Sequence, residues 1–252
     1  MIFINNIEQL KNQNPNPGTE FYNLQTGHEY VYTGHEYVDI TKGIPTNGLV
    51  AHYSMNNIVG TTVVDETGNY NATATGITIE DGVIDDSAHF DGSNSFITVP
   101  GGVIDTMDNG LTISIWLNYT NTDFAHLFQA TETAATNRLN MHWDWYGTSF
   151  VDIGNISAGG RLSFTTDTSL FGKWIHFAVT SDGSTGKAYI NGELIGSLTN
   201  TSAFTATSRT LYIGKQDPDT SNDFLGNMDN IKIYNRSLTH GEVYALSKEL
   251  SN

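Results

Sequence analysis

The sequence of 252 residues predicts an all-β protein, built as a large antiparallel sandwich of two sheets. Glycine and asparagine are abundant and proline is sparse, while threonine, valine, isoleucine and tyrosine fill runs of alternating polarity, a composition typical of strands joined by turns. Turn signals separate these runs, and Asn191-Gly192 is the sequence of a type I′ hairpin. Residues 111–117 place leucine or isoleucine at every second position and so present one apolar face to a second sheet.

Residues 1–46 precede the sandwich and predict a short, mostly irregular N-terminal arm. A seven-residue repeat occupies residues 26–32 and 33–39, and each copy is a Thr-Gly turn followed by a β-prone run. Two copies suit a small hairpin or two edge strands, which is too little to fold alone. We therefore expect the arm to lie on a surface, either its own sandwich or a scaffold protein. The candidate anchoring residues are His28, Tyr30, His35 and Tyr37.

The chain ends in a predicted strand followed by a short helix. Residues 228–234 alternate as a strand, and Asn235-Arg236 then forms a turn. Thr239 can cap the helix while Glu242, three residues later, reaches back, which is the spacing of a capping box. The apolar stripe of this helix consists of Val243, Leu246 and Leu250.

Six segments of the chain resemble, in order, the signature segments of laminin-G-like jelly rolls, members of the concanavalin A-like lectin/glucanase superfamily. Among them are Asp-Glu-Thr-Gly-Asn-Tyr-Asn, Phe-Asp-Gly-Ser and the closing Gly-Asn-Met-Asp-Asn-Ile-Lys-Ile-Tyr-Asn. The resemblance implies a jelly roll over residues 47–252 that holds a glycan or a protein rather than reacting with it. The six segments are residues 48–55, 65–72, 88–99, 111–117, 173–194 and 224–238.

Composition and charge exclude several classes of partner. The chain has 27 acidic against 11 basic residues, so it repels phosphate backbones, and we expect no nucleic-acid partner. It has no cysteine, which excludes disulfides and thiolate metal sites. Residues 1–6 lack the basic and long apolar regions of a signal peptide, and no apolar run is long enough to span a bilayer. We expect a protein made in the cytosol without a signal peptide and without membrane insertion.

Catalysis has to be considered because the resembled superfamily includes glycoside hydrolases. Its laminarinase-type members carry Glu-x-Asp-x-x-Glu or Glu-x-Asp-x-Glu on one strand, which places two carboxylates on the same face. No glutamate of this sequence is followed by aspartate and glutamate at that spacing. We therefore expect no enzymatic activity, with a divergent glycoside hydrolase as the least favoured alternative.

An aromatic cluster at residues 141–146 is the candidate ligand platform. Strand alternation places Met141, Trp143 and Trp145 on one face and the other three residues on the opposite face. An exposed indole beside an aspartate and a histidine suits the stacking and hydrogen bonding of a sugar ring. The alternative is that both tryptophans are core, and exposure of Trp145 and Tyr146 distinguishes the two interpretations. The candidate glycan-binding residues are His142, Trp143, Asp144, Trp145 and Tyr146.

Calcium is the candidate cofactor. In the resembled family the metal often lies near the sheet edge, held by an acidic residue of the closing strand and by backbone carbonyls near the opening strands, and the resemblance implies Asp229 for the acidic role. Asn230 stands where the family usually has glutamate, so one charge is missing. Asp217, Asp219 and Asp223 lie in one loop, a spacing compatible with the oxygen ligands that calcium prefers. The alternative for this loop is a solvated acidic turn.

Taken with the arm, these features favour a non-enzymatic binding or adhesion module, displayed on a larger assembly such as a virion. Phage capsid-decoration and fibre proteins share this layout of an N-terminal anchor, a lectin-like head, an acidic composition and no cysteine. The head would bind surface glycans weakly, and multivalency would supply avidity. The alternative is a structural decoration or cement protein without a sugar site, and homo-oligomerisation is left open.

Overall fold

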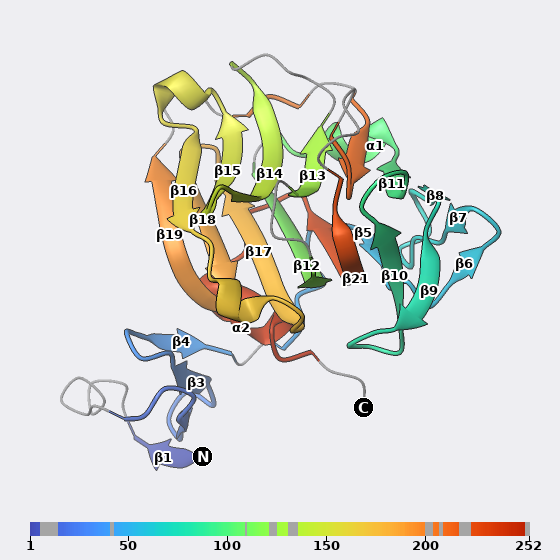
Figure 1. Ribbon diagram of the computed structural model, residues 1–252. Coiled ribbons are helices and arrows are strands. Elements are labelled where there is room, and N and C mark those ends of the chain that lie inside the picture. The colour runs from blue at the N-terminus through green and yellow to red at the C-terminus, as the bar shows by residue number, and fades with distance from the viewer. Residues whose placement is uncertain are drawn as a thin grey trace.

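The computed structural model describes residues 1–5, 15–40, 43–108, 110–120, 125–130, 136–199, 204–206, 209–216 and 223–249. As predicted, it is an all-β sandwich of two facing sheets, with a short arm at one end and a short helix near the C-terminus (Figure 1). The helices are α1 (Gly101–Ile104) and α2 (His240–Leu246), with single 3₁₀ turns at Ile156–Ala158 and Thr168–Leu170. Among these residues, none of the helices combines the length and apolar character needed to cross a membrane.

The first sheet of the sandwich has eight strands, and β21 (Leu225–Tyr234) lies at its centre. The N-terminal half of β21 pairs with β10 and its C-terminal half with β5, while β12 pairs along its other edge. In spatial order the strands are β19 (Glu193–Thr199), β18 (Thr185–Ile190), β17 (Ile175–Ser181), β12 (Leu111–Tyr119), β21, β10 (Asp86–Asp91) and β9 (Thr78–Asp81), with β5 (Leu49–Tyr53) paired to β21.

The second sheet has nine strands and carries the candidate site described below. Its central strands β15, β14 and β13 follow one another as antiparallel neighbours. In spatial order the strands are β16 (Arg161–Thr165), β15 (Thr148–Gly154), β14 (Arg138–Trp145), β13 (Ala125–Ala130), β20 (Leu211–Ile213), β11 (Phe96–Val99), β8 (Ala72–Thr75), β7 (Thr62–Val63) and β6 (Ile58–Val59).

The main core lies between these two sheets and is apolar. The predicted stripe on β12 is confirmed, because Leu111, Ile113, Ile115 and Leu117 are all buried in one continuous cluster with residues of the nine-stranded sheet. The turn at Asp65, inside one of the signature segments, is held by the Asp65 carboxylate. This carboxylate accepts hydrogen bonds from the backbone N–H groups of His52, Thr67 and Tyr70. Such a turn fixes how the chain passes from β5 to the other sheet.

The N-terminal arm is more ordered than expected, because it forms a four-stranded sheet. Its strands are β1 (Ile2–Ile4), β2 (Glu20–Asn23), β3 (Glu29–Tyr32) and β4 (Tyr37–Asp39), with β1 parallel to β2 and the others antiparallel. The two copies of the repeat supply β3 and β4, and Val31 pairs with Val38, its counterpart in the repeat. The prediction of a mostly irregular arm is corrected here, since residues 2–4 and 20–23 add two strands to the predicted hairpin.

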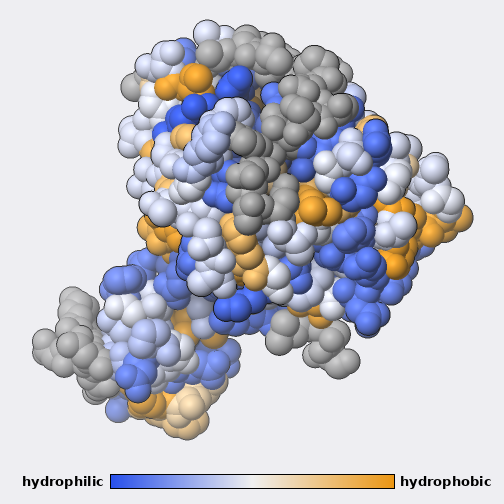
Figure 2. Space-filling model, in the orientation of Figure 1, coloured by the Kyte–Doolittle hydropathy of each residue, from blue (hydrophilic) through white to orange (hydrophobic). Residues whose placement is uncertain are grey.

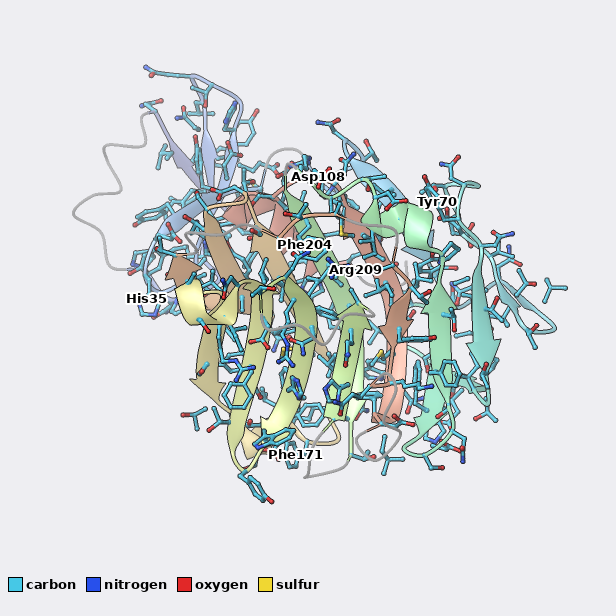
Figure 3. The ribbon with its side chains drawn as sticks, turned by 90° about the horizontal axis from the view of Figure 1, so that it is seen from above. His35, Tyr70, Asp108, Phe171, Phe204 and Arg209 are labelled. Carbon is cyan, nitrogen blue, oxygen red and sulfur yellow. The ribbon has the colours of Figure 1, made fainter. Side chains whose placement is uncertain are left out.

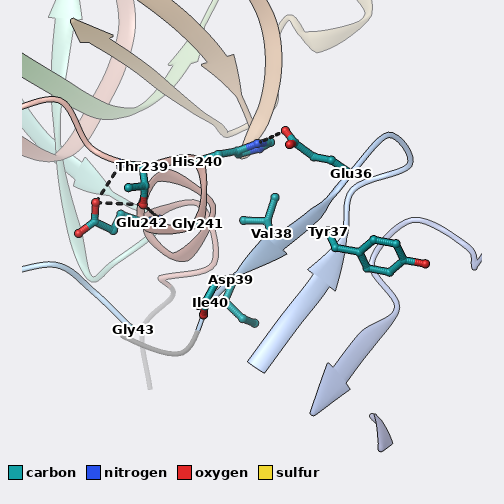
Figure 4. Close-up of a pocket in the computed structure, with 10 residues that line it drawn as sticks. All are labelled: Glu36, Tyr37, Val38, Asp39, Ile40, Gly43, Thr239, His240, Gly241 and Glu242. Carbon is teal, nitrogen blue, oxygen red and sulfur yellow. Dashed lines mark hydrogen bonds and ion pairs between the residues drawn. The ribbon is translucent and has the colours of Figure 1, made fainter. Parts of the chain in front are cut away.

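This N-terminal sheet lies against α2 of the sandwich. Val31 and Val38 are buried on Tyr244, and His240 Nδ1 lies 2.6 Å from Glu36 Oε1. A pocket of about 350 Å³ opens between β4 and the start of α2 (Figure 4). At that start the predicted capping box of Thr239 and Glu242 is confirmed, with both of its hydrogen bonds formed.

Candidate functional site

Polar side chains gather on the outer face of the nine-stranded sheet. Because side chains alternate along a strand and paired residues share a face, the register aligns one polar row across six strands. The alternate residues of β14 and β15, such as Leu139 and Val151, point into the core instead. Figure 3 shows nitrogen-bearing side chains clustered over the green and yellow strands β13 to β15. The row consists of Thr98, Tyr212, Gln129, Asn140, Asp152 and Arg161.

A pocket of about 350 Å³ opens on this face. It combines two guanidinium groups, an indole ring, a phenyl ring, an imidazole and three amides, and among the described residues no carboxylate lines it. Such a mixture of aromatic surface and hydrogen-bonding groups is typical of small-ligand sites. The lining residues are Gln129, Arg138, Asn140, His142, Trp145, Phe150, Arg161 and Gln216.

Trp145 reaches this pocket because the regular alternation of β14 breaks just before it. The pairing with β15 shifts between His142 and Trp145, and Asp144 adopts a left-handed backbone with φ of 54°. As a result Trp145 lies on the same face as His142, with 5.5 Å between the two ring centroids. The predicted alternation, which placed Trp145 on the face of Met141 and Trp143, is therefore wrong for this residue. Its side chain is 38% exposed.

The other predicted platform residues have different places. Trp143 is 1% exposed and belongs to the core, where its ring lies 4.9 Å from that of Tyr119. Asp144 is buried in β14, where its carboxylate accepts a hydrogen bond at 3.1 Å from the N–H of Gly147 in the turn that follows. Tyr146 is 80% exposed in that turn and is not among the residues that line the pocket. The exposure of Trp145 and Tyr146 favours the lectin interpretation over the structural one, in which both side chains would be buried.

Asp152 holds the two arginines of the pocket in place from below. Its carboxylate is fully buried and accepts hydrogen bonds from Arg161 Nε and Nη2, both at 2.6 Å, and from Arg138 Nη1 at 3.2 Å. The hydrogen bonds to Asp152 raise the pKa of the Arg161 guanidinium. That guanidinium also lies 4.9 Å from the centre of the Phe150 ring, a cation–π contact. Both arginines are thus oriented before any ligand arrives.

His142 is neutral and offers a fixed donor. Burial, followed by the charges of Arg161 and Arg138, lowers its pKa to about 4. Its Nε2 lies 3.0 Å from Asn140 Nδ2 and 3.1 Å from His126 Nε2. Because an amide nitrogen can only donate, Nε2 accepts and the ring proton lies on Nδ1. Within the described part of the chain, neither His142 Nδ1 nor Asn140 Oδ1 has a hydrogen-bond partner.

Asp229, which the resemblance implies as a calcium ligand, is fully buried in β21, and calcium binding at this residue stays a prediction. Its Oδ2 accepts hydrogen bonds from the backbone N–H groups of Val83 and Ile84, at 2.9 and 2.8 Å. Burial raises the pKa of the carboxyl to about 6, and the described residues contain no group of three metal-ligating side chains. Asp223 is buried, and Asp217 and Asp219 lie outside the described residues, so calcium binding in that loop stays a prediction.

The predicted anchoring residues contribute mainly to the N-terminal sheet itself. Tyr30 and Tyr37 pack on its small apolar cluster around Phe21, and the rings of Tyr37 and Phe21 are 5.4 Å apart. His28 Nδ1 lies 2.7 Å from Asp39 Oδ2, while His35 is exposed at the turn between β3 and β4. Their role in anchoring stays a prediction.

Sequence reasoning missed most of the pocket. Arg138, Asn140 and His142 alternate with Leu139 and Met141, a pattern that assigns them to the outer face of one strand. That pattern was available in the sequence. The sequence does not reveal that Arg138 and Arg161 meet at Asp152, because their meeting depends on the register of three strands.

The comparison with known families agrees with this architecture. The family model described as Concanavalin A-like lectin/glucanases superfamily matches residues 91–244, more than half of the chain. The chain belongs to this superfamily. A comparison with curated protein sequences found no match.

Solved structures with the same fold include both binding domains and an enzyme. Domain 4 of AbnA, a GH43 extracellular arabinanase from Geobacillus stearothermophilus solved in complex with arabinotriose, is 26% identical with a TM-score of 0.63, covering 79% of this chain and 98% of that domain. The binding domain of botulinum neurotoxin serotype G is 16% identical with a TM-score of 0.62, covering 79% of this chain and 50% of that one. Trypanosoma rangeli sialidase in complex with 2,3-difluorosialic acid is 17% identical with a TM-score of 0.63, covering 92% of this chain and 44% of that one. The last two likenesses concern the fold alone.

Proposed function

We propose that this member of the superfamily is a non-catalytic carbohydrate-binding module whose ligand site is the pocket on the nine-stranded sheet. The observation that carries the proposal is the indole of Trp145, which is turned onto the polar face by the break at Asp144. A partly exposed indole beside hydrogen-bonding amides offers both stacking and directional contacts to a sugar ring. The arabinotriose bound to domain 4 of the arabinanase supports a glycan as the class of ligand.

The chemistry of the pocket favours binding over hydrolysis. Glycoside hydrolysis generally requires two carboxyl groups that flank the scissile bond. The described residues that line this pocket include none, and Asp152 beneath it is fully buried and bonded to two arginines. His142 Nδ1–H and Asn140 Oδ1 remain as a donor and an acceptor without a partner among the described residues. Buried polar atoms of this kind are usually satisfied by a ligand or by water.

The N-terminal sheet is the proposed attachment element, which would display the module on a scaffold such as a virion protein. Figure 2 shows an apolar surface at the end of this sheet farthest from the sandwich. Met1, Ile2 and Phe3, in or beside β1, are between 45% and 64% exposed. Exposed apolar side chains grouped in this way support contact with another protein.

Glycan binding is tested with the full chain on a glycan array, followed by calorimetry of the strongest hits. We expect weak binding that is lost, about tenfold or more, in Trp145→Ala and largely kept in Trp145→Phe, because a phenyl ring still stacks on a sugar. Tyr146→Ala is the matched control, since Tyr146 is an exposed aromatic residue next to the pocket but not in its lining. Absence of binding to every glycan, or equal loss in both alanine variants, contradicts the proposal.

A further inference from the structure

We propose that the sugar recognised by this pocket is acidic, carrying a ring carboxylate that lies against the guanidinium groups of Arg138 and Arg161. This inference rests on the proposed function, because it names the class of glycan for the same site. It begins from the charges that the fold brings together beneath and around the pocket.

The pocket is positive in a strongly acidic protein. Arg138 and Arg161 line it, whereas Asp152, the carboxylate that pairs with them, is fully buried below, so this group of three carries one net positive charge. The whole chain has a formal net charge of −16. A neutral sugar would leave the excess positive charge uncompensated when binding desolvates it, whereas a carboxylate would compensate it.

The two arginines keep hydrogen-bonding capacity for a ligand. Asp152 takes only Nη1 of Arg138 and only Nε and Nη2 of Arg161, and the described residues provide no other hydrogen bond to either group. Their side chains are 25% and 35% exposed, so the remaining N–H donors can be reached from the pocket. A guanidinium held in place by one carboxylate is pre-organised to bind a second one through paired hydrogen bonds.

Two further observations agree with a positive pocket. The largest charge effects on His142 come from Arg161 and Arg138, and both lower its pKa, so the imidazole experiences a net positive surrounding. A third arginine, Arg209, does not line the pocket: it lies over the Phe204 ring and donates to Asn137 O (Figure 3). The arginine pair at Asp152 therefore supplies positive charge on the face that carries Trp145.

The test compares hexuronate oligosaccharides with their carboxyl-reduced counterparts, which keep the ring and lose the charge. Suitable probes are oligogalacturonate, oligoguluronate and hyaluronan oligosaccharides, measured by calorimetry with the full chain. We expect at least one acidic probe to bind about tenfold more tightly than its reduced form. That preference should weaken between ~20 and ~300 mM NaCl, because the charges are partly exposed.

Variants then locate the preference. Arg138→Gln should remove the preference, measured as the ratio of the affinities for the acidic probe and its reduced form, whereas Arg138→Lys should keep part of it, since lysine preserves the charge without the planar guanidinium. Lys187→Gln removes an equal charge from an exposed site on β18 of the other sheet and should have no effect.

The outcomes separate the inference from the function on which it rests. If neutral or reduced glycans bind as tightly as acidic ones, and Trp145→Ala abolishes that binding, the pocket binds glycans but the inference of an acidic sugar is wrong. If no glycan of either kind binds, the proposed function fails and the inference with it.

Discussion

The rings of His142 and Trp145 lie edge to face on one face of β14, with their centroids 5.5 Å apart, although strand alternation assigns the two residues to opposite faces. Asp144 causes this arrangement, because its left-handed backbone, with φ of 54°, inserts a bulge between them. The bulge turns Trp145 away from the core face of β14 and into the polar pocket of the nine-stranded sheet. Bulges commonly re-aim a side chain next to a functional site.

The bulge should depend on the residue at position 144. Asp144→Asn keeps an acceptor for Gly147 N–H and tolerates the left-handed backbone, so we expect a change in unfolding free energy within about 0.5 kcal/mol. Asp144→Val should cost about 1–3 kcal/mol, since a β-branched residue is strained in that conformation. Urea unfolding of the two variants measures the difference. Equal stability would show that position 144 imposes no such constraint.

Asp152 should be the structural support of the pocket. Asp152→Ala leaves two partly buried guanidinium groups without a counter-charge, and breaking such a buried pair costs about 3 kcal/mol or more. Ser163→Ala, on the neighbouring strand β16, serves as a control of similar size. Thermal unfolding checks both variants. A loss of thermal stability for Asp152→Ala no greater than that of the control would contradict the structural role of the two ion pairs at Asp152.

The burial of neutral His142 should make stability depend on pH. Its pKa is about 4 in the folded protein, below its ordinary value of 6.5, so the unfolded chain binds a proton first as the pH falls. The stability of the protein relative to a His142→Gln variant should therefore be fully present above pH 6.5 and decline between pH 6.5 and about 4. NMR titration of the ring gives the folded pKa directly. A ring that titrates near its ordinary value would contradict the account.

Asp229 should show the opposite dependence. Burial raises its pKa to about 6 from an ordinary value of 3.8, so its charged form is disfavoured in the folded state at neutral pH. We expect Asp229→Asn to be more stable at pH 7, by on the order of 2 kcal/mol, and the gain to vanish as the pH falls from 6 to below 3.8. Added calcium tests the predicted metal site separately. A calcium-dependent gain in stability confined to the wild type would identify Asp229 as a metal ligand, whereas an equal response of wild type and variant would contradict that site.

Gly241 should control the contact between the N-terminal sheet and α2. In an isolated helix Gly→Ala is favourable by about 1 kcal/mol. Here a Cβ at Gly241 would overlap the backbone carbonyl of Asp39. We expect Gly241→Ala to make residues 15–40 sensitive to protease while the melting temperature of the sandwich changes little. Lys187→Ala, at an exposed position on β18, is the control. Unchanged protection would show that the sheet does not depend on this contact.

The sequence was sufficient for the architecture and insufficient for the site. Three features of the architecture depend only on residues that are close together in the sequence, so the sequence alone predicts them. They are the alternation along residues 111–117, the capping box at Thr239 and the signature segments. The orientation of Trp145 depends on one backbone angle at Asp144, which the sequence does not reveal. The pairing of Arg138 with Arg161 through Asp152 depends on register between strands, which one sequence cannot supply.

The central claim is that a glycan occupies the face of the nine-stranded sheet at His142 and Trp145. The most direct measurement is a titration of isotope-labelled protein with a bound glycan from the array, followed by amide and indole NMR signals. The account predicts saturable shifts at the Trp145 indole and along β13 to β15, with the strands β17 to β19 unaffected. Shifts confined to β17 to β19 or to the N-terminal sheet, with the Trp145 indole unchanged, would contradict it.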